Sequence, residues 1–269
     1  MEKITHVYNK NPIKLEKNIT LNIVLETIFK EEVSHIPLFS RDKMTGILSE
    51  KDILFKLGSA RTWNVDISSL HASSFANLPV ISINPEASLE EAVKKMLDNE
   101  IGFLSVEDNE GRFLGILTKE DIMKYLRKRF VDIKVGEIMT STVISLSLDE
   151  CVLRARDIIM RYKYSVLPVI DNGKLVGIVD DISLLRYLAS IYEKVEWRYR
   201  EHKTRLTIVS DVYRREYATL NVNESVTEAI EILSRGEKAV LITENNTLKG
   251  IITKTDILVL YISEMKESS

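Results

Sequence analysis

The stretch Gly115-Ile116-Leu117-Thr118-Lys119-Glu120-Asp121-Ile122 places a hydroxyl after a glycine and two apolar residues, and an aspartate three residues later. This pattern predicts a short buried strand that ends where a helix begins. The same frame recurs at residues 46–53 and 250–257, and once more, with different polar residues, at 177–184. Recurrence at matching places indicates internal repeats, and repeats decide the fold before any single element does.

Each copy of the frame closes a unit that we predict to run strand, helix, strand, strand, helix. A unit this short buries too little apolar surface to be stable alone, so the units should pair. The predicted fold class is α/β, built from four β-α-β-β-α repeats, with the first repeat paired to the second and the third to the fourth. The expected boundaries are residues 1–60, 75–130, 136–190 and 207–266.

Composition excludes several classes of protein. The 269 residues carry a net charge of −3, which argues against a dedicated nucleic-acid binder. Residues 191–205 mix charged and aromatic side chains, and we expect a helical extension there rather than a nucleic-acid surface. The only cysteine, Cys151, allows no internal disulfide and fits a reducing compartment. No apolar run is long enough to span a bilayer and no signal-peptide core is present, so we expect a cytoplasmic protein without a membrane partner.

Enzymatic chemistry is the class of function that the sequence favours least. The chain has four histidines and lacks a Cys/His cluster, a glycine-rich phosphate loop and a nucleophile elbow. Residues at a spacing suited to a metal ion are also missing. We therefore expect no catalytic residues, no metal and no required cofactor.

Two interpretations of the hydroxyl and aspartate remain open from the residues alone. The pair can be a helix cap, in which the hydroxyl accepts from helical amides and the acid accepts from the backbone amide of the N-cap residue, as in a capping box. Alternatively, a phosphate can lie on the helix amides and the hydroxyl, while the carboxylate accepts from two ribose hydroxyls. A pure cap favours Glu or Gln at the acidic position, whereas all three intact copies have Asp. We call these copies the intact junctions: Ser49–Asp52, Thr118–Asp121 and Thr253–Asp256.

With these repeats and junctions, the chain resembles tandem CBS (cystathionine β-synthase) domain proteins, whose paired repeats form Bateman modules. Four repeats without an attached enzyme are most similar to the gamma subunit of AMP-activated protein kinase and to stand-alone prokaryotic four-CBS proteins. The resemblance covers nearly the whole chain. It implies two modules packed into a flattened disc, with adenosine-nucleotide sites in clefts between paired sheets.

The resemblance also assigns roles to individual residues. The junction hydroxyls should contact a phosphate, the aspartates should hold ribose hydroxyls, and the backbone of the first strands should lie near the adenine. A histidine on the second strand either points at a phosphate across the centre of the disc or is only structural. The residues concerned are Ser49, Thr118 and Thr253 for phosphate, Asp52, Asp121 and Asp256 for ribose, Ile13, Val80 and Thr219 for adenine, and His35.

The third repeat departs from the pattern of the other three. Asp180 stands in the place of the hydroxyl, and Ser183 stands in the place of the aspartate. A carboxylate facing a phosphate costs about 1 kcal/mol at ~4 Å in bulk water, and more when water is excluded. We expect this third junction to be empty or to bind something uncharged.

Three functions are compatible with the sequence. The first is a regulatory module that binds AMP, ADP or ATP without reacting with it, and that acts on an unidentified protein partner or within a homodimer. The second keeps the clefts but binds S-adenosylmethionine or another adenosyl ligand. The third is an interaction scaffold without any ligand, in which the junctions are only helix caps.

Overall fold

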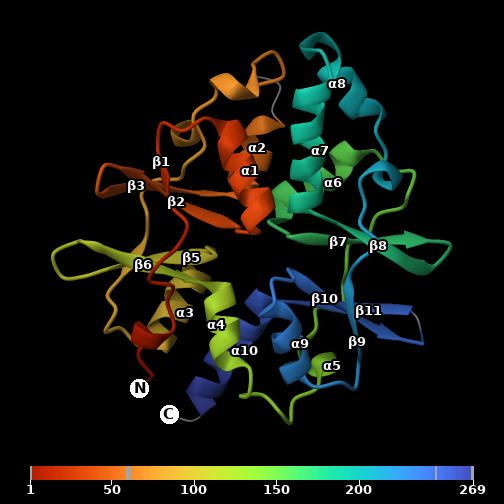
Figure 1. Ribbon diagram of the computed structural model, residues 1–269. Coiled ribbons are helices and arrows are strands. Elements are labelled where there is room, and N and C mark those ends of the chain that lie inside the picture. The colour runs from red at the N-terminus through yellow and green to blue at the C-terminus, as the bar shows by residue number, and fades with distance from the viewer. Residues whose placement is uncertain (1, 59–61, 246, 268–269) are drawn as a thin grey trace.

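The computed structural model describes residues 2–58, 62–245 and 247–267, and it arranges four repeats around a common centre (Figure 1). Repeats 1 and 2 have a three-stranded sheet each. In both, the first strand runs parallel to the second, and the second runs antiparallel to the third. Their elements are β1 (Leu15–Glu16), α1 (Leu21–Glu31), β2 (His35–Ser40), β3 (Lys43–Ser49) and α2 (Glu50–Leu57), then β4 (Ser82–Ile83), α3 (Leu89–Asp98), β5 (Phe103–Glu107), β6 (Phe113–Thr118) and α4 (Lys119–Leu126).

Repeats 3 and 4 follow the same order, apart from a short added helix at Val135–Ile138 and two further differences from the predicted elements. The expected first strand of repeat 3 is reduced to a single parallel bridge between Leu146 and Val169. The expected helical extension is two helices, because α7 continues to Lys194 and α8 begins at Trp197. The elements are α5 (Val135–Ile138), α6 (Val152–Tyr162), β7 (Val166–Asp171), β8 (Lys174–Asp180), α7 (Asp181–Lys194), α8 (Trp197–Leu206), β9 (Ala218–Asn221), α9 (Val226–Leu233), β10 (Ala239–Glu244), β11 (Thr247–Thr253) and α10 (Lys254–Glu267), with short 3-10 turns at Ile4–His6, Ile67–Ser69, Ala72–Ser74 and Val209–Asp211.

The helices form because their apolar residues recur at helical spacing and produce one buried face. In α3 this face consists of Leu89, Ala92, Val93 and Met96. The residue equivalent to Ala92 is wholly buried in every repeat; the four are Val24, Ala92, Ala155 and Ala229. The four repeats therefore share one helix register, and the four-repeat α/β fold predicted from the sequence is confirmed. None of the described helices has the length and apolar character that a membrane crossing requires.

The buried side chains show how the repeats meet. Helices of repeats 1 and 3 share one apolar core, and helices of repeats 2 and 4 share another. The sheets make the other contacts: the rings of Phe39 and Phe113 lie 5.1 Å apart between repeats 1 and 2. Val166 and Leu241 belong to a smaller apolar cluster between repeats 3 and 4. Every repeat thus contacts one neighbour through its sheet and another through its helices, and all four converge at the centre.

The segment that leads into each repeat crosses to the sheet of a neighbouring repeat. There it bridges to the residue that follows the strand glycine, and the approach is close. A Cβ atom at Gly115 would lie 2.2 Å from the Asn9 carbonyl oxygen, and one at Gly177 would lie 2.4 Å from that of Arg214. Only glycine fits such an approach. The bridges of these four crossing segments are Asn9 with Ile116, Asn77 with Ile47, Thr140 with Ile251 and Arg214 with Ile178.

Candidate functional site

All three intact junctions adopt the same hydrogen-bond geometry at the start of a helix. At the first, Oδ2 of Asp52 accepts from the backbone amide of Ser49 at 2.8 Å and also from its hydroxyl. Asp121 and Asp256 accept in the same way from Thr118 and Thr253, at 2.6 to 2.9 Å. The hydroxyl and aspartate of each intact junction therefore do form a helix cap, and this cap leaves room for a second role. The box uses one carboxylate oxygen, so the second oxygen of each aspartate remains to interact with another group.

The intact junctions differ from the third junction in their access to solvent. The hydroxyl and aspartate side chains of the three intact junctions are only half-buried. Partial burial raises the pKa of Asp121 above its ordinary value. Asp180 and Ser183, by contrast, are both buried, and Asp180 is wholly so. The amide of Ser183 donates to Asp180 at 2.8 Å, which preserves the helix cap without exposing it.

A crossing segment supplies a partner for the aspartate of the first junction. Nδ2 of Asn77 donates to Oδ1 of Asp52 at 2.6 Å, although Asn77 belongs to the segment that leads into repeat 2. Our interpretation of the sequence did not identify this position. A signal was nevertheless present, since each bridging residue lies eleven residues before the N-cap of the first helix of its repeat. The pairs are Asn9 and Thr20, Asn77 and Ser88, Thr140 and Cys151, and Arg214 and Ser225.

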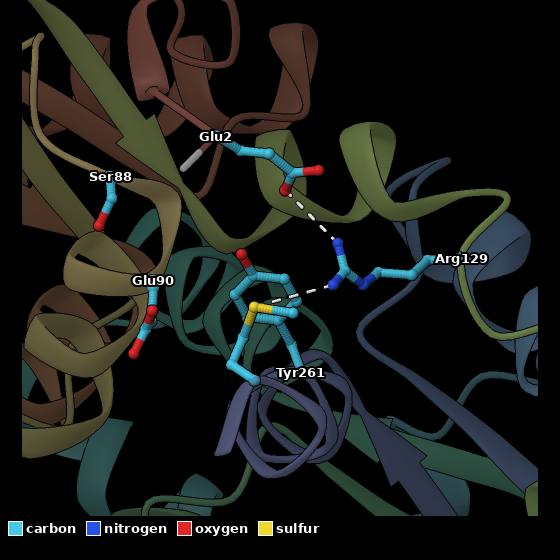
Figure 2. Close-up of a pocket in the computed structure, with 6 residues that line it drawn as sticks. Glu2, Ser88, Glu90, Arg129 and Tyr261 are labelled. Atoms are coloured by element: carbon cyan, nitrogen blue, oxygen red, sulfur yellow. Dashed lines mark hydrogen bonds and ion pairs between the residues drawn. The ribbon is translucent and has the colours of Figure 1, made fainter. Parts of the chain in front are cut away.

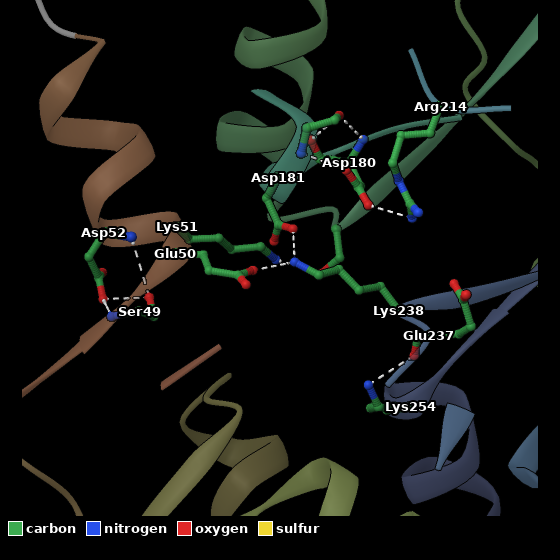
Figure 3. Close-up of polar contacts among 12 residues, drawn as sticks. Ser49, Glu50, Lys51, Asp52, Asp180, Asp181, Arg214, Glu237, Lys238 and Lys254 are labelled. Carbon is green, nitrogen blue, oxygen red and sulfur yellow. Dashed lines mark hydrogen bonds and ion pairs between the residues drawn. The ribbon is translucent and has the colours of Figure 1, made fainter. Parts of the chain in front are cut away.

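Four lysines gather where the helix N-termini converge, and we call Lys51, Lys119, Lys238 and Lys254 the central lysines (Figure 3 shows three of them). Their contacts join different repeats. Lys119 of repeat 2 donates to the hydroxyl of Thr255 in repeat 4 at 2.9 Å. Lys51 of repeat 1 donates to the hydroxyl of Ser165 in repeat 3 at 2.8 Å. The sequence places these lysines at ordinary polar positions, and only the fold brings them together.

The central lysines are unequally neutralised. Lys238 contacts the buried carboxylates of Glu50 and Asp181, which raise its pKa although burial alone would lower it. Burial, together with the charge of Asp181, also raises the pKa of Glu50 to about 7 despite Lys238. The other three ammonium groups donate to hydroxyl or carbonyl oxygens and have no carboxylate within 4 Å among the described residues. Burial lowers the pKa of all three, and that of Lys119 falls to about 8.

His35 lies beside the central lysines, opposite Ser49 on the neighbouring strand. Its ring is 5.1 Å from that of Phe103 in repeat 2. Burial lowers the pKa of His35 to about 4, and the charges of Lys238, Lys51 and Lys254 contribute further. The ring is therefore neutral at pH 7 and has one N–H to donate. Its contact with a phosphate stays a prediction.

The positions expected near the adenine fall in two different settings. Ile13 and Val80 are half-buried on crossing segments, between the bridging asparagine and the strand that follows. Thr219 is exposed in β9, where it pairs with Leu241. Ile13 and Val80 therefore lie on segments that connect two sheets, whereas Thr219 lies within one sheet. Their contact with an adenine stays a prediction.

Two cavities lie away from the junction side chains. One, of about 410 Å³, is bounded by Arg129, which contacts Glu2 and stacks over the ring of Tyr261 at 4.9 Å (Figure 2). The other, of about 270 Å³, lies between repeats 3 and 4 and includes Ser145 and Lys249 in its lining. Neither is lined by a junction hydroxyl or aspartate. In the described part of the chain, no cluster of three or more His, Cys, Asp or Glu could hold a metal ion.

Comparison with known proteins agrees with the geometry. The profile of the CBS domain matches residues 4–59, 72–128, 135–190 and 209–263. The uncharacterized protein MJ1225 of Methanocaldococcus jannaschii is 23% identical over 272 residues, covering 93% of this chain and 95% of its own. An uncharacterized 33.4 kDa protein of Thermofilum pendens is 25% identical over 250 residues, covering 87% of this chain and 83% of its own.

Solved structures share the fold along the chain. The crystal structure of MJ1225, a protein put forward as an archaeal homologue of g-AMPK, superimposes with a TM-score of 0.84 at 18% identity, covering 96% of this chain and 99% of that one. An uncharacterized conserved protein from Pyrococcus horikoshii gives 0.63 at 20% identity, with the same coverage of both chains. These similarities concern the fold, and the four profile matches together span most of the sequence. The chain belongs to the CBS domain family.

Proposed function

We propose that this CBS domain protein is a regulatory module that binds AMP, ADP or ATP at its three intact junctions and carries out no reaction on the nucleotide. The helix N-terminus at each junction offers amide groups to a phosphate. The carboxylate oxygen outside the capping box can accept from ribose hydroxyls, at the first junction beside or in place of Asn77. The half-buried state of these junctions leaves both groups within reach of a ligand.

The observation that carries the proposal is the poor neutralisation of three of the four central lysines. Lys51, Lys119 and Lys254 are half-buried, and among the described residues they donate only to neutral oxygens. Charges in such surroundings are stabilised strongly by an opposite charge nearby. A phosphate extending from a junction toward the centre would supply that charge. The junctions alone would fit any adenosyl compound, but the lysines favour an anionic one.

This electrostatic argument separates nucleotides from S-adenosylmethionine. The sulfonium of S-adenosylmethionine is positive and the molecule has no phosphate, so the central lysines would repel its charged centre. Lys119 and Lys51 each contact a second repeat, and a phosphate held there would alter contacts between repeats. We propose that repeats 1 and 2, and repeats 3 and 4, act as two modules. An unidentified partner protein or a second copy of the chain would respond to a change in how the modules meet.

Calorimetric titration tests the proposal directly. The native chain and the variants D52A, D121A and D256A are titrated with AMP, ADP, ATP and S-adenosylmethionine, with the exposed Asp149→Ala as matched control. Each junction variant should lose one binding site, whereas D149A should lose none. Unchanged binding in all three junction variants would refute the nucleotide sites. Loss of a cap costs about 1 kcal/mol of stability, so thermal melting must accompany each titration.

Two outcomes would point to the other functions. If S49A and T118A leave the binding of S-adenosylmethionine intact while nucleotides fail to bind, the clefts serve an adenosyl ligand without phosphate. If no nucleotide or adenosyl compound shifts the melting temperature of the native chain, the protein is a scaffold and the junctions are caps. A bound state favoured by a ligand always raises apparent stability, so the absence of any shift is informative.

A further inference from the structure

The crossing segment of repeat 4 carries a residue unlike those of the other three. Asn9, Asn77, Thr140 and Arg214 occupy equivalent bridging positions, and only the last has a long, charged side chain. An arginine is always protonated in proteins, so a charge is permanently present at this position. The third junction, which faces it, is also the one with a buried acid. The two departures from the repeat pattern therefore lie at the same junction, and we use cleft for the expected ligand space between a junction and the crossing segment that faces it.

The side chains of this cleft are joined to each other (Figure 3). Nη2 of Arg214 donates to Oδ2 of Asp180 at 2.9 Å, and the other carboxylate oxygen holds the amide of Ser183. Two backbone hydrogen bonds between Arg214 and Ile178, at 2.8 and 2.9 Å, fix the arginine against the strand. Nε of Arg214 is buried without a hydrogen-bond partner among the described residues. The ion pair therefore ties the crossing segment of repeat 4 to the buried junction of repeat 3.

The first junction shows the equivalent contact with a neutral side chain. There the equivalent residue, Asn77, reaches Asp52 with a short neutral amide, and Asn77 is exposed while Asp52 is half-buried. The third cleft instead buries Asp180 completely, with a guanidinium beside it. A buried charge is tolerated when it is paired, and removing one partner leaves the other buried and uncompensated. If Arg214 left the cleft, the buried carboxylate of Asp180 would lose its ion-pair partner.

We propose that Arg214 is a built-in occupant of the third cleft and, with Asp180, determines that this cleft takes no nucleotide. The inference rests on the proposed function for the other three clefts. It goes further by naming the residues that decide occupancy. Serine at 180, aspartate at 183 and asparagine at 214 would reproduce the side chains of the first cleft. Changing only the two junction residues would leave the guanidinium in the cleft.

The test counts nucleotide equivalents bound by the 269-residue chain, using ATP in equilibrium dialysis. The variant D180S/S183D should bind as many equivalents as the native chain. The variant D180S/S183D/R214N should bind one more, with circular dichroism showing that each variant is folded. An extra equivalent in the two-residue variant, or none in the folded three-residue variant, would overturn the proposal.

A second measurement needs no ligand and separates this inference from the proposed function. R214A should lower the melting temperature of the native chain, because Asp180 loses its partner. The same change should lower it much less in a D180S background. Equal falls in the two backgrounds would show that Arg214 is not held by Asp180, and would overturn the inference. A native chain that binds no nucleotide would refute the proposed function, and the melting comparison would still decide whether Arg214 is the occupant.

Discussion

The ammonium group of Lys119 donates a 2.9 Å hydrogen bond to the hydroxyl of Thr255, which belongs to a different repeat. Thr255 lies between Thr253 and Asp256, so this lysine of repeat 2 reaches the junction of repeat 4. The charge of Asp256 acts on Lys119, and the charge of Glu120 acts on Lys254, so the influence is reciprocal. The helix starts of repeats 2 and 4 are therefore electrostatically coupled across the centre.

This coupling predicts that Lys119 contributes to binding at the junction of another repeat. In the background D52A/D121A, only the site at Thr253 and Asp256 should remain. Adding K119M should weaken nucleotide binding there by about tenfold to a hundredfold, because a hydrogen bond to a charged group contributes about 1.5–3 kcal/mol. Calorimetric titration with ATP measures the change. The exposed Lys174→Met is the control and should have no effect; equal affinity with and without K119M would contradict the coupling.

The lowered pKa of Lys119 predicts a pH dependence of nucleotide binding. Burial, with Lys51 and Lys254, lowers this pKa from 10.5 to about 8, despite Asp256. A bound phosphate favours the charged form and raises the pKa again. Binding near pH 8 should therefore take up a proton, and affinity should fall as pH rises through 8. Titrations at pH 8 in two buffers of different ionisation enthalpy measure the uptake, which should decrease in K119M.

The same lowered pKa of Lys119 has the opposite effect on the stability of the ligand-free chain as pH rises. The unfolded state binds more protons at this lysine between pH 8 and 10.5, so its contribution makes the free energy of unfolding rise with pH in that window. Affinity and ligand-free stability should thus respond to this group in opposite directions. If both fell together in the native chain and equally in K119M, Lys119 would not be the titrating group.

The parts of the fold that the sequence predicts are those that repeat locally. The junction frame and the buried helix faces each depend on residues within a few positions, and the structure confirms the four repeats. The bond between Asn77 and Asp52 joins residues 25 positions apart. The contacts of Lys238 with Asp181 and Glu50 span 57 and 188 positions. Such contacts depend on how repeats pack against each other, which local periodicity does not determine.

The first strand of repeat 3 shows that a local sequence pattern can also predict an element that the structure barely forms. Residues 143–146 have the composition of a strand, yet they make only one bridge to the sheet. Strand propensity describes a side chain that fits a half-buried pleated surface, and its expression depends on the tertiary partner. Likewise, Lys238 follows an acidic residue in a polar loop, and the sequence alone would predict a solvent-exposed side chain. Only the approach of Glu50 and Asp181 makes it a central residue.

The lowered pKa of His35 predicts that this residue causes part of the loss of stability at acid pH. Its pKa is lowered from 6.5 to about 4, so the unfolded state binds the extra proton in that window. The stability contribution of this group therefore falls as pH decreases from 6.5 toward 4, by at most about 3 kcal/mol. H35Q, which cannot ionise there, should lose this dependence. Denaturant unfolding at a series of pH values measures it, with the exposed His202→Gln as control.

The native profile alone would not reveal this effect, because Glu50 acts in the opposite direction. Its pKa is raised from 4.5 to about 7, so the folded state keeps a proton that the unfolded state releases. That contribution makes stability fall as pH rises from 4.5 to 7. The prediction therefore concerns the difference between the native chain and H35Q. A difference that does not change between pH 4 and 6.5 would contradict it.

Lys238 predicts the largest loss of stability from a single charge. Its side chain is 17% exposed, and its ammonium group lies between Glu50 and Asp181, whose side chains are 6% and 5% exposed. K238M would leave two buried carboxylates without a cation, at a cost of about 3–5 kcal/mol. The exposed pair of Lys249 and Glu244 provides the control, and K249M should cost less than about 1 kcal/mol. Denaturant unfolding at pH 8 measures both.

The pH dependence and a rescue variant separate lost charge pairing from lost packing. At pH 5 the carboxyl of Glu50, with its raised pKa, can remain protonated, so K238M should be less damaging there than at pH 8. E50Q and D181N added to K238M should recover most of the loss at pH 8, because neutral amides need no cation. Equal damage by K238M at both pH values, without rescue, would mean that the methylene chain of Lys238 matters and its charge does not. Since the three residues come from repeats 4, 1 and 3, the loss should appear as a single cooperative transition.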